Sequence, residues 1–231
     1  MIKNFYFFII AFFFLSSCKP PANLLSGTVT NTKTKSVTDL FVRSMHDAND
    51  TTFVNLEDYS KEFIYDIKYA TSDNFLKEKV YECASCYLRL KTVKSLISAN
   101  NEFKLKGYTI KIFDCYRPLD IQKKMWNMVP NSNYVADPKK GSIHNRGGAV
   151  DITLINENGE ELDMGTLFDY FGPEAAHSYS NLPEGILQNR KLLKDIMVQN
   201  NFISFDSEWW HYNLKDGNLD KISNFKWTCK E

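Results

Sequence analysis

The chain has 231 residues, enough for one domain of ordinary size or two small ones. Apolar residues make up 43% and charged residues 24%, a mix that excludes a disordered, collagen-like or multi-pass membrane protein. Lys+Arg and Asp+Glu both number 28, and this balance does not support a nucleic-acid binder, which usually carries a basic excess. We therefore expect a globular protein with no nucleic-acid partner.

The first 18 residues have the layout of an export signal. Lys3 supplies a positive charge, and an unbroken apolar run of 11 residues follows from Phe5 to Leu15. This run suits a signal peptide and is shorter than the about 20 residues that a membrane-spanning helix needs. Residues 15–18 read LSSC, which resembles the bacterial lipobox, in which small residues precede a lipidated Cys. The pattern predicts a lipoprotein signal peptide over residues 1–17 and lipidation at Cys18, with a plain secretory signal as the alternative.

Cleavage before Cys18 leaves 214 residues with 27 basic and 28 acidic side chains. Residues 18–52 are expected to form a lipidated, flexible tether, because residues 26–52 are rich in Ser, Thr and Asn and lack a sustained apolar period. One folded domain is expected over residues 53–231. The expected location is the bacterial cell envelope, as a membrane-anchored and periplasmic lipoprotein.

The folded part mixes strands and helices. Strands are predicted at residues 63–69, which are β-rich and partly alternating, and at residues 108–113, which alternate cleanly. Further strands are predicted at residues 149–155, 202–205 and 209–214. Helices are predicted where apolar residues recur at intervals of three and four, from about residue 88 to a stop at Gly107, from Pro118 to about residue 128, and over residues 184–200. Several connections resemble hairpins. The pattern predicts a single α+β domain with a largely antiparallel sheet flanked by helices.

Four cysteines follow Cys18, at positions 83, 86, 115 and 229. The CxxC of Cys83 and Cys86 has no second pair at zinc-finger spacing and no thioredoxin-like βαβ pattern around it, so it favours neither a structural zinc site nor a redox site. In an exported protein these four cysteines allow two disulfides in three connectivities. We expect at least one bridge, and the sequence leaves its partners open.

A first chemical motif reads SIHNRGGAVD at residues 142–151. His144 and Asp151 lie seven residues apart, with a glycine pair between them that allows a turn and a close backbone approach. His144 is therefore expected on a loop and Asp151 on the strand that follows, with both side chains converging on one ion. Taken alone, this spacing also arises by chance.

A second motif reads EWWHY at residues 208–212. Its aromatics favour a strand, on which Glu208 and His211 would point oppositely, so Glu208 is expected at the strand's entry, where the chain can still bend. With the first motif this gives two His and one carboxylate, the ligand set of a catalytic zinc site with one open position. Glu208 is then the spare carboxylate that acts as general base. The alternative is an aromatic core strand with a surface Glu.

A third motif reads FDCYRP at residues 113–118. Arg117 lies between the end of one strand and the start of a helix, and it could hold a carbonyl oxygen as negative charge develops there. The alternative is a structural arginine paired with Asp114. Both are compatible, because Asp114 can orient Arg117 for the first role.

Together these motifs resemble the D-alanyl-D-alanine dipeptidases of the VanX type, within the larger group of zinc D,D-peptidases. The SxHxxGxAxD-like pattern lies at residues 142–151, the ExxH pattern at 208–211 and the Asp-x-Tyr-Arg-Pro pattern at 114–118. Residues 69–75 (YATSDNF) and 164–169 (MGTLFD) resemble the dipeptidase branch in particular. The similarity runs from about Leu56 to Tyr212. The chain departs from the family at Cys115, where a small residue is common, and in its lipobox and tether.

The resemblance implies a fold shared with zinc D,D-peptidases and hedgehog-like signalling domains. It implies one zinc ion per chain, bound by His144, Asp151 and His211. Glu208 matches the catalytic base of the family. Arg117 matches the residue that stabilises the transition state.

The resemblance also implies the substrate. Ser142 matches the position that contacts the substrate carboxylate, and Tyr69 and Asp169 match those that recognise the amino end. The implied reaction is zinc-dependent hydrolysis of the dipeptide D-Ala-D-Ala to two D-Ala. One alternative is a zinc D,D-carboxypeptidase that trims peptidoglycan stems, and Tyr69 with residues 74–75 favours the dipeptidase over it. The other is a non-catalytic zinc-binding envelope lipoprotein, against which the presence of both Glu208 and Arg117 argues.

Overall fold

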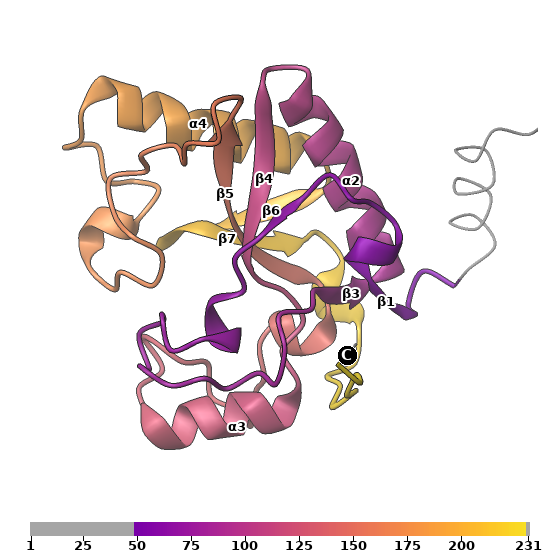
Figure 1. Cartoon of the computed structure of the whole chain (residues 1–231). Coiled ribbons are helices and arrows are strands. Elements are labelled where there is room, and N and C mark those ends of the chain that lie inside the picture. The colour runs from indigo at the N-terminus through magenta and orange to yellow at the C-terminus, as the bar shows by residue number, and fades with distance from the viewer. Residues whose placement is uncertain (1–48, 230–231) are drawn as a thin grey trace, which may run out of the picture. The chain divides into compact units, whose positions relative to one another are not determined.

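The computed structural model describes residues 49–229 (Figure 1). The predicted signal peptide, Cys18 and the tether up to residue 48 lie outside the described residues. The last residues of the predicted tether contact the folded part, because the carbonyls of Asp50 and Thr52 accept hydrogen bonds from the backbone N–H groups of Lys91 and Leu90. No helix in the described part of the chain is long and apolar enough to cross a membrane.

A five-stranded sheet forms the centre of the described domain (Figure 1). In spatial order its strands are β2 (Ile64–Tyr65), β4 (Tyr108–Asp114), β5 (Ala149–Asn156), β7 (Glu208–Leu214) and β6 (Phe202–Phe205). The β2–β4 pair is parallel and the other three pairs are antiparallel. A separate two-stranded antiparallel sheet, which the sequence did not predict, joins β1 (Phe53–Asn55) to β3 (Tyr87–Arg89). The predicted α+β class with a largely antiparallel sheet is confirmed.

Three helices were predicted, and the structure contains α2 (Leu90–Lys104), α3 (Leu119–Met128) and α4 (Glu184–Gln199) near the predicted bounds. α2 packs against β4, α4 packs against β6, and the two helices contact each other. Their apolar faces bury side chains such as Leu96 of α2 and Ile196 of α4 in one core cluster. α3 follows the carboxyl end of β4, with Pro118 just before its first turn rather than within it.

The strand predicted over residues 63–69 is mostly wrong. Only Ile64 and Tyr65 pair with β4, and the chain then turns into a short 3-10 helix at Lys68–Ala70. The N–H groups of Ala70 and Thr71 donate back to the carbonyls of Ile67 and Lys68, which replaces sheet pairing. The turn buries Tyr69 to 2% exposure, so its ring lies inside the domain instead of alternating along a strand.

All four cysteines in the described residues form disulfides, one between Cys83 and Cys229 and one between Cys86 and Cys115. At least one bridge was expected, and the structure selects one of the three connectivities that the sequence left open. The second bridge ties the end of β4 to the segment just before β3.

Candidate active site

One cavity of about 610 Å³ is lined by all eight side chains that the sequence singled out in the folded part. These are Tyr69, Arg117, Ser142, His144, Asp151, Asp169, Glu208 and His211. They come from segments as far apart in sequence as residues 69 and 211, and the fold brings every one of them to the same place. The cavity lining also includes aromatic residues from two loops, Tyr134 and Phe171, which the sequence did not predict.

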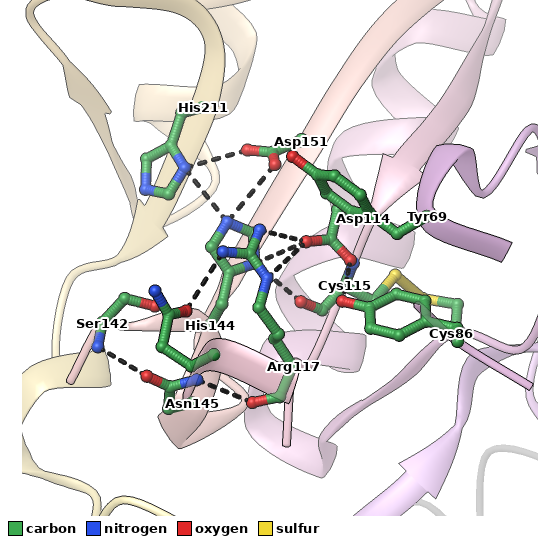
Figure 2. Close-up of polar contacts among 12 residues, drawn as sticks. Tyr69, Cys86, Asp114, Cys115, Arg117, Ser142, His144, Asn145, Asp151 and His211 are labelled. Carbon is green, nitrogen blue, oxygen red and sulfur yellow. Dashed lines mark hydrogen bonds and ion pairs between the residues drawn. A yellow bond between two sulfur atoms is a disulfide. The ribbon is translucent and has the colours of Figure 1, made fainter. Parts of the chain in front are cut away.

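The three predicted metal ligands converge at this cavity (Figure 2). Nε2 of His144 lies 3.2 Å from Nδ1 of His211. The carboxylate of Asp151 lies 2.9 Å from Nδ1 of His211 and 3.4 Å from Nε2 of His144. One atom from each residue therefore lies within 4.8 Å of the others, and the group is a candidate site for a metal ion.

Sheet register aligns two of these ligands with Asp114. Asp151 of β5 pairs with Asp114 of β4 on one side and with His211 of β7 on the other. Direct partners on adjacent strands share a face, so the three side chains form one row across the sheet. A bulge at Phe113 makes this row possible: Ile112 pairs with Ile152, and the next pair is Asp114 with Asp151. Without the extra residue, Phe113 would face the site in place of Asp114.

The second nitrogen of each histidine is held by an oxygen. Nδ1 of His144 lies 2.6 Å from the carbonyl oxygen of Cys115, and Nε2 of His211 lies 2.9 Å from Oδ1 of Asn213. A carbonyl oxygen can only accept, so these nitrogens carry the ring protons. The unprotonated Nε2 of His144 and Nδ1 of His211 then face each other beside a carboxylate. Two lone pairs and a carboxylate around one point fit a bound cation, and this N, N, O donor set suits zinc.

The pKa shifts within the cluster also favour a bound cation. Burial raises the pKa of Asp151, but the charges and hydrogen bonds of the two histidines outweigh it and hold this pKa well below its usual range. Burial lowers the pKa of His211, but the hydrogen bond and charge of Asp151 reverse the effect and raise it to about 9. The cluster therefore favours positive charge at the point where the ligand atoms meet.

The glycine pair provides the turn that the sequence predicted. His144 begins a short 3-10 helix, His144–Arg146, which ends at Gly147 with a φ of +75°. A Cβ on Gly147 would lie 2.5 Å from a ring carbon of Phe53 and 3.1 Å from the backbone nitrogen of Arg89. Glycine is required both for the left-handed backbone and for this close approach, which together place His144 ahead of β5.

Glu208 lies at the entry of β7, as expected, and its Oε2 is 4.0 Å from Nδ1 of His211. Pairing with β6 shifts here: Ser204 pairs with Tyr212, and the next pair is Phe205 with Glu208. This irregularity allows Glu208 and His211, three residues apart, to reach the same cavity. Burial raises the pKa of Glu208, the charge of His211 opposes this, and the net pKa is raised, which suits a group that accepts and returns a proton.

Arg117 is buried and held by a fixed set of partners. Its Nε and one terminal nitrogen donate to Oδ2 of Asp114 at 3.2 and 2.5 Å, and its other terminal nitrogen donates to Oε1 of Gln122 at 3.1 Å. The guanidinium carbon lies 5.1 Å from the centre of the Tyr69 ring. Burial lowers the pKa of Arg117, but Asp114 outweighs it and keeps this pKa well above the usual value. The expected orientation of Arg117 by Asp114 is therefore present.

In the same cavity, the hydroxyl of Tyr69 donates to Oδ2 of Asp169 at 2.9 Å. Burial and the negative charge of Asp151 raise the pKa of Asp169 well above its usual value, although the hydrogen bond from Tyr69 opposes them. The hydroxyl of Ser142 is buried and has no hydrogen-bond partner among the described residues. Asp169 and Ser142 thus offer a carboxyl group and an unused donor to a ligand.

Two further aromatic side chains connect loops for which the sequence predicted no helix or strand. The rings of Tyr134 and Phe171 stack with their centres 4.5 Å apart, and Phe171 packs edge-on against Phe75 at 5.0 Å. Both Tyr134 and Phe171 line the cavity. The pair joins loop residues 129–141 to loop residues 163–172. No periodic pattern marked these aromatics in the sequence.

Asn145 and Gln122 were also missed. Asn145 is fully buried: its side-chain amide donates to the carbonyl of Arg117 at 2.8 Å, and its Oδ1 accepts from the N–H of Ser142 at 2.8 Å. Asn145 thereby ties two candidate site residues together, but an Asn in a Gly-rich loop gives no distinct sequence signal. Gln122 has a recognisable sequence signal, because it lies three residues before Met125, and residues at this spacing share a face of a helix. Both side chains are buried on the inner face of α3.

Two imidazoles and a carboxylate around one point, with a separate carboxylate and a buried arginine in the same cavity, define a metal-dependent hydrolase site. Comparison with known proteins agrees with this class. The peptidase M15 family model described as D-ala-D-ala dipeptidase matches residues 49–227. The chain belongs to this family of metallopeptidases, and the family resemblance found in the sequence is confirmed.

Relatives carry the same description. A D-alanyl-D-alanine dipeptidase of Escherichia coli is 38% identical over 150 residues, which cover 64% of this chain and 77% of the relative. One of Enterococcus faecium is 31% identical over 173 residues, covering 66% of this chain and 86% of the relative. A solved structure of the LD-carboxypeptidase LdcB matches with a TM-score of 0.39 at 22% identity, covering 58% of this chain and 63% of that one.

Proposed function

We propose that this protein hydrolyses D-Ala-D-Ala to two D-Ala, with one zinc ion per chain bound by His144, Asp151 and His211. The observation that carries the proposal is the convergence of these three ligands within 4.8 Å in the cavity that also contains Glu208 and Arg117. Membership in the dipeptidase family supports the substrate.

When bound, zinc lowers the pKa of a coordinated water toward ~7 and polarises the carbonyl of the peptide bond. Glu208 accepts the proton of the attacking water and later donates it to the leaving amine, a role for which its raised pKa is suited. Arg117 has N–H groups beyond those that Asp114 and Gln122 use, and they hold the oxygen on which negative charge develops. Asp114 and Gln122 keep this guanidinium fixed throughout.

Different groups in the cavity recognise the carboxylate end and the ammonium end of the substrate. The unused hydroxyl of Ser142 donates to the carboxylate of the dipeptide. Asp169, held by Tyr69, receives the free ammonium group. Its charge is stabilised when that cation arrives, because an adjacent positive charge favours the ionised carboxyl.

A zinc D,D-carboxypeptidase would share all three metal ligands. The Tyr69–Asp169 pair favours the dipeptidase, because a carboxyl group in the same cavity as the ligands suits a free ammonium rather than the continuing chain of a peptidoglycan stem. The test is release of free D-Ala by the purified protein from the dipeptide and from a stem pentapeptide. Release from the dipeptide alone supports the proposal, release mainly from the pentapeptide supports the carboxypeptidase, and release from neither supports a non-catalytic zinc protein.

We also propose that the protein is a lipoprotein of the cell envelope, anchored to a membrane through Cys18. The motivation is the LSSC run at residues 15–18 after an apolar stretch. Mass spectrometry of the membrane fraction should find a lipid chain on Cys18, and Cys18→Ala should remove it. Recovery of the wild-type protein entirely as an unlipidated form would refute this proposal.

A further inference from the structure

Three atoms of Cys115, its sulfur, its carbonyl oxygen and its backbone nitrogen, are each held by a different partner (Figure 2). Its sulfur is bonded to Cys86, its carbonyl oxygen accepts from Nδ1 of His144 at 2.6 Å, and its N–H donates to Oδ1 of Asp114 at 2.8 Å. The carbonyl bond fixes the proton of His144 on Nδ1 and thereby leaves Nε2 free to bind a metal ion. One backbone unit thus contacts both a candidate zinc ligand and the carboxylate that holds Arg117.

The other half of the disulfide belongs to a rigid part of the core. Cys86 has no exposed surface and Cys115 has 2%. The carbonyl of Cys86 accepts from the N–H of Leu56, and the carbonyl of the adjacent Tyr87 accepts from the N–H of Tyr116. The segment after β4 is therefore joined to this core segment twice, by the Cys86–Cys115 disulfide and by the backbone hydrogen bond from Tyr116 to Tyr87.

The segment after β4 has no regular secondary structure and is held by individual hydrogen bonds and by the buried ring of Tyr116. Sheet pairing between β4 and β5 ends at Asp114 with Asp151, and α3 begins only at Leu119. Within this gap the N–H groups of Tyr116 and Arg117 donate to the carbonyls of Tyr87 and His144. The disulfide adds a covalent constraint at Cys115, the residue whose carbonyl oxygen meets Nδ1 of His144.

We propose that the Cys86–Cys115 disulfide is a positioning element of the zinc site, which holds the Cys115 carbonyl against Nδ1 of His144. The cross-link keeps the ligand in the tautomer and orientation that bind zinc. This inference rests on the metal site proposed above. It assigns a role to a cysteine at a position where the chain departs from the pattern of the family that it resembles.

The same chain provides a matched control. The Cys83–Cys229 disulfide spans 146 residues, against 29 for Cys86–Cys115. The hydrogen bonds of Cys83 go to Ser85 and Trp227, which are not among the proposed ligands or catalytic residues. In the chain-entropy account, removing the bridge that closes the longer loop lowers the free energy of unfolding of the protein by at least as much as removing the other bridge. A purely structural role would therefore make the control the more harmful change.

The first experiment compares C86S/C115S with C83S/C229S in the full chain, with zinc affinity measured by chelator competition and the Tm measured on zinc-free protein. C86S/C115S should weaken zinc binding about ten- to hundredfold, the range found when the groups that orient metal ligands are changed. C83S/C229S should keep its zinc affinity within about threefold, even with an equal or larger fall in Tm. Equal zinc affinity in both variants, or loss that follows Tm, would overturn the proposal.

A second measurement uses the unaltered protein and covers the case in which C86S/C115S does not fold. In a glutathione redox buffer each protein disulfide takes two electrons from two glutathione thiols, which become one glutathione disulfide. Coupling is reciprocal, so zinc should protect Cys86–Cys115 from reduction at equilibrium by the same tenfold or more. Mass spectrometry would quantify both bridges. Equal protection of the two would refute a specific link between Cys86–Cys115 and zinc.

The two proposals fail differently. If the unaltered protein neither binds zinc nor releases D-Ala from the dipeptide, the proposed function is wrong. If it does both, and the two double variants bind zinc equally, only the positioning role of the disulfide is wrong.

Discussion

Oε2 of Glu208 lies 4.0 Å from Nδ1 of His211, beside the three converging ligand atoms but not among them. That distance is too long for a hydrogen bond, so Glu208 is not paired with the candidate ligand His211. In the proposed mechanism Glu208 exchanges protons with the attacking water instead of binding the metal.

Glu208→Gln should keep its zinc and its fold while kcat for D-Ala-D-Ala falls about 10²- to 10⁴-fold, the usual contribution of a general acid–base. The amide keeps the size of the side chain and removes the proton-accepting charge. Steady-state kinetics with parallel metal analysis checks this. A metal-replete variant with near-normal kcat would mean that Glu208 is not the base.

His211→Ala should release zinc and activity together, because it removes one of two nitrogen ligands and leaves Asp151 buried without its closest partner. Unaltered protein should contain about one zinc per chain. His177→Ala is the matched control, since His177 does not line the cavity. Elemental analysis of dialysed samples is the measurement, and full occupancy in His211→Ala would contradict the ligand assignment.

Arg117→Ala should retain zinc and lose kcat about a hundred- to a thousandfold, the size of one lost oxyanion donor. The loss should fall on kcat rather than KM, because the charge it holds exists only in the transition state. Gln122→Met tests the support of Arg117, since it removes the acceptor 3.1 Å from the guanidinium and leaves the salt bridge to Asp114. Gln122→Met should lower kcat less than Arg117→Ala does. A larger effect on KM than on kcat in Arg117→Ala would instead place the arginine in ground-state binding.

Much of this arrangement could be predicted from the sequence, because local patterns determine it. Alternation predicted β4, a strand was also predicted at the position of β5, and the glycine pair predicted the turn at Gly147 that places His144 before β5. The eight cavity residues followed from short motifs and the family resemblance that they carry. Their convergence depends on the strand order, on turns such as the one at Gly147, and on the register shifts within the sheet.

The parts that could not be predicted depend on pairing between distant segments. The bulge at Phe113, which turns Asp114 to the site, exists only in the register with β5. Disulfide partners depend on distances across the fold, so residues 86 and 115 could not be matched in advance. Asn145 acts through hydrogen bonds to two backbone positions, and nothing in its own neighbourhood marks that role.

The stability of the protein should fall in acid partly through His177. Burial lowers the pKa of His177 from 6.5 to about 4, and the charges of Lys194 and Arg190 add to the effect. A depressed histidine pKa means that the unfolded state binds the proton more readily, so this stability is present above pH 6.5 and lost as pH falls toward 4. The contribution is smaller than about 3.5 kcal/mol, since one unit of pKa is ~1.4 kcal/mol and solvent screens a half-buried side chain.

His177→Gln should therefore show a flatter decline of the free energy of unfolding between pH 6.5 and 4 than the unaltered protein. Denaturant unfolding of zinc-free samples at several pH values measures this without the metal site. Parallel curves for the two proteins would show that His177 is protonated equally in the folded and unfolded states.

The last prediction concerns the length of the substrate. The stacked rings of Tyr134 and Phe171 join two loops at the cavity, near the end where Tyr69 and Asp169 lie. A dipeptide ends at its ammonium group, whereas a longer peptide must continue past these rings. We therefore expect Tyr134→Ala to admit peptides that the unaltered protein excludes.

In Tyr134→Ala, kcat/KM for the dipeptide should change less than about tenfold, since the substitution removes the ring contact with Phe171, an aromatic pair worth ~1 kcal/mol. Release of D-Ala from a tripeptide ending in D-Ala-D-Ala should become measurable. Leu167→Ala is the control, because Leu167 belongs to the same loop as Phe171, is 84% exposed and does not line the cavity. If both variants reject the tripeptide as the unaltered protein does, exclusion resides deeper, at the Tyr69–Asp169 pair, and Asp169→Asn becomes the variant to assay.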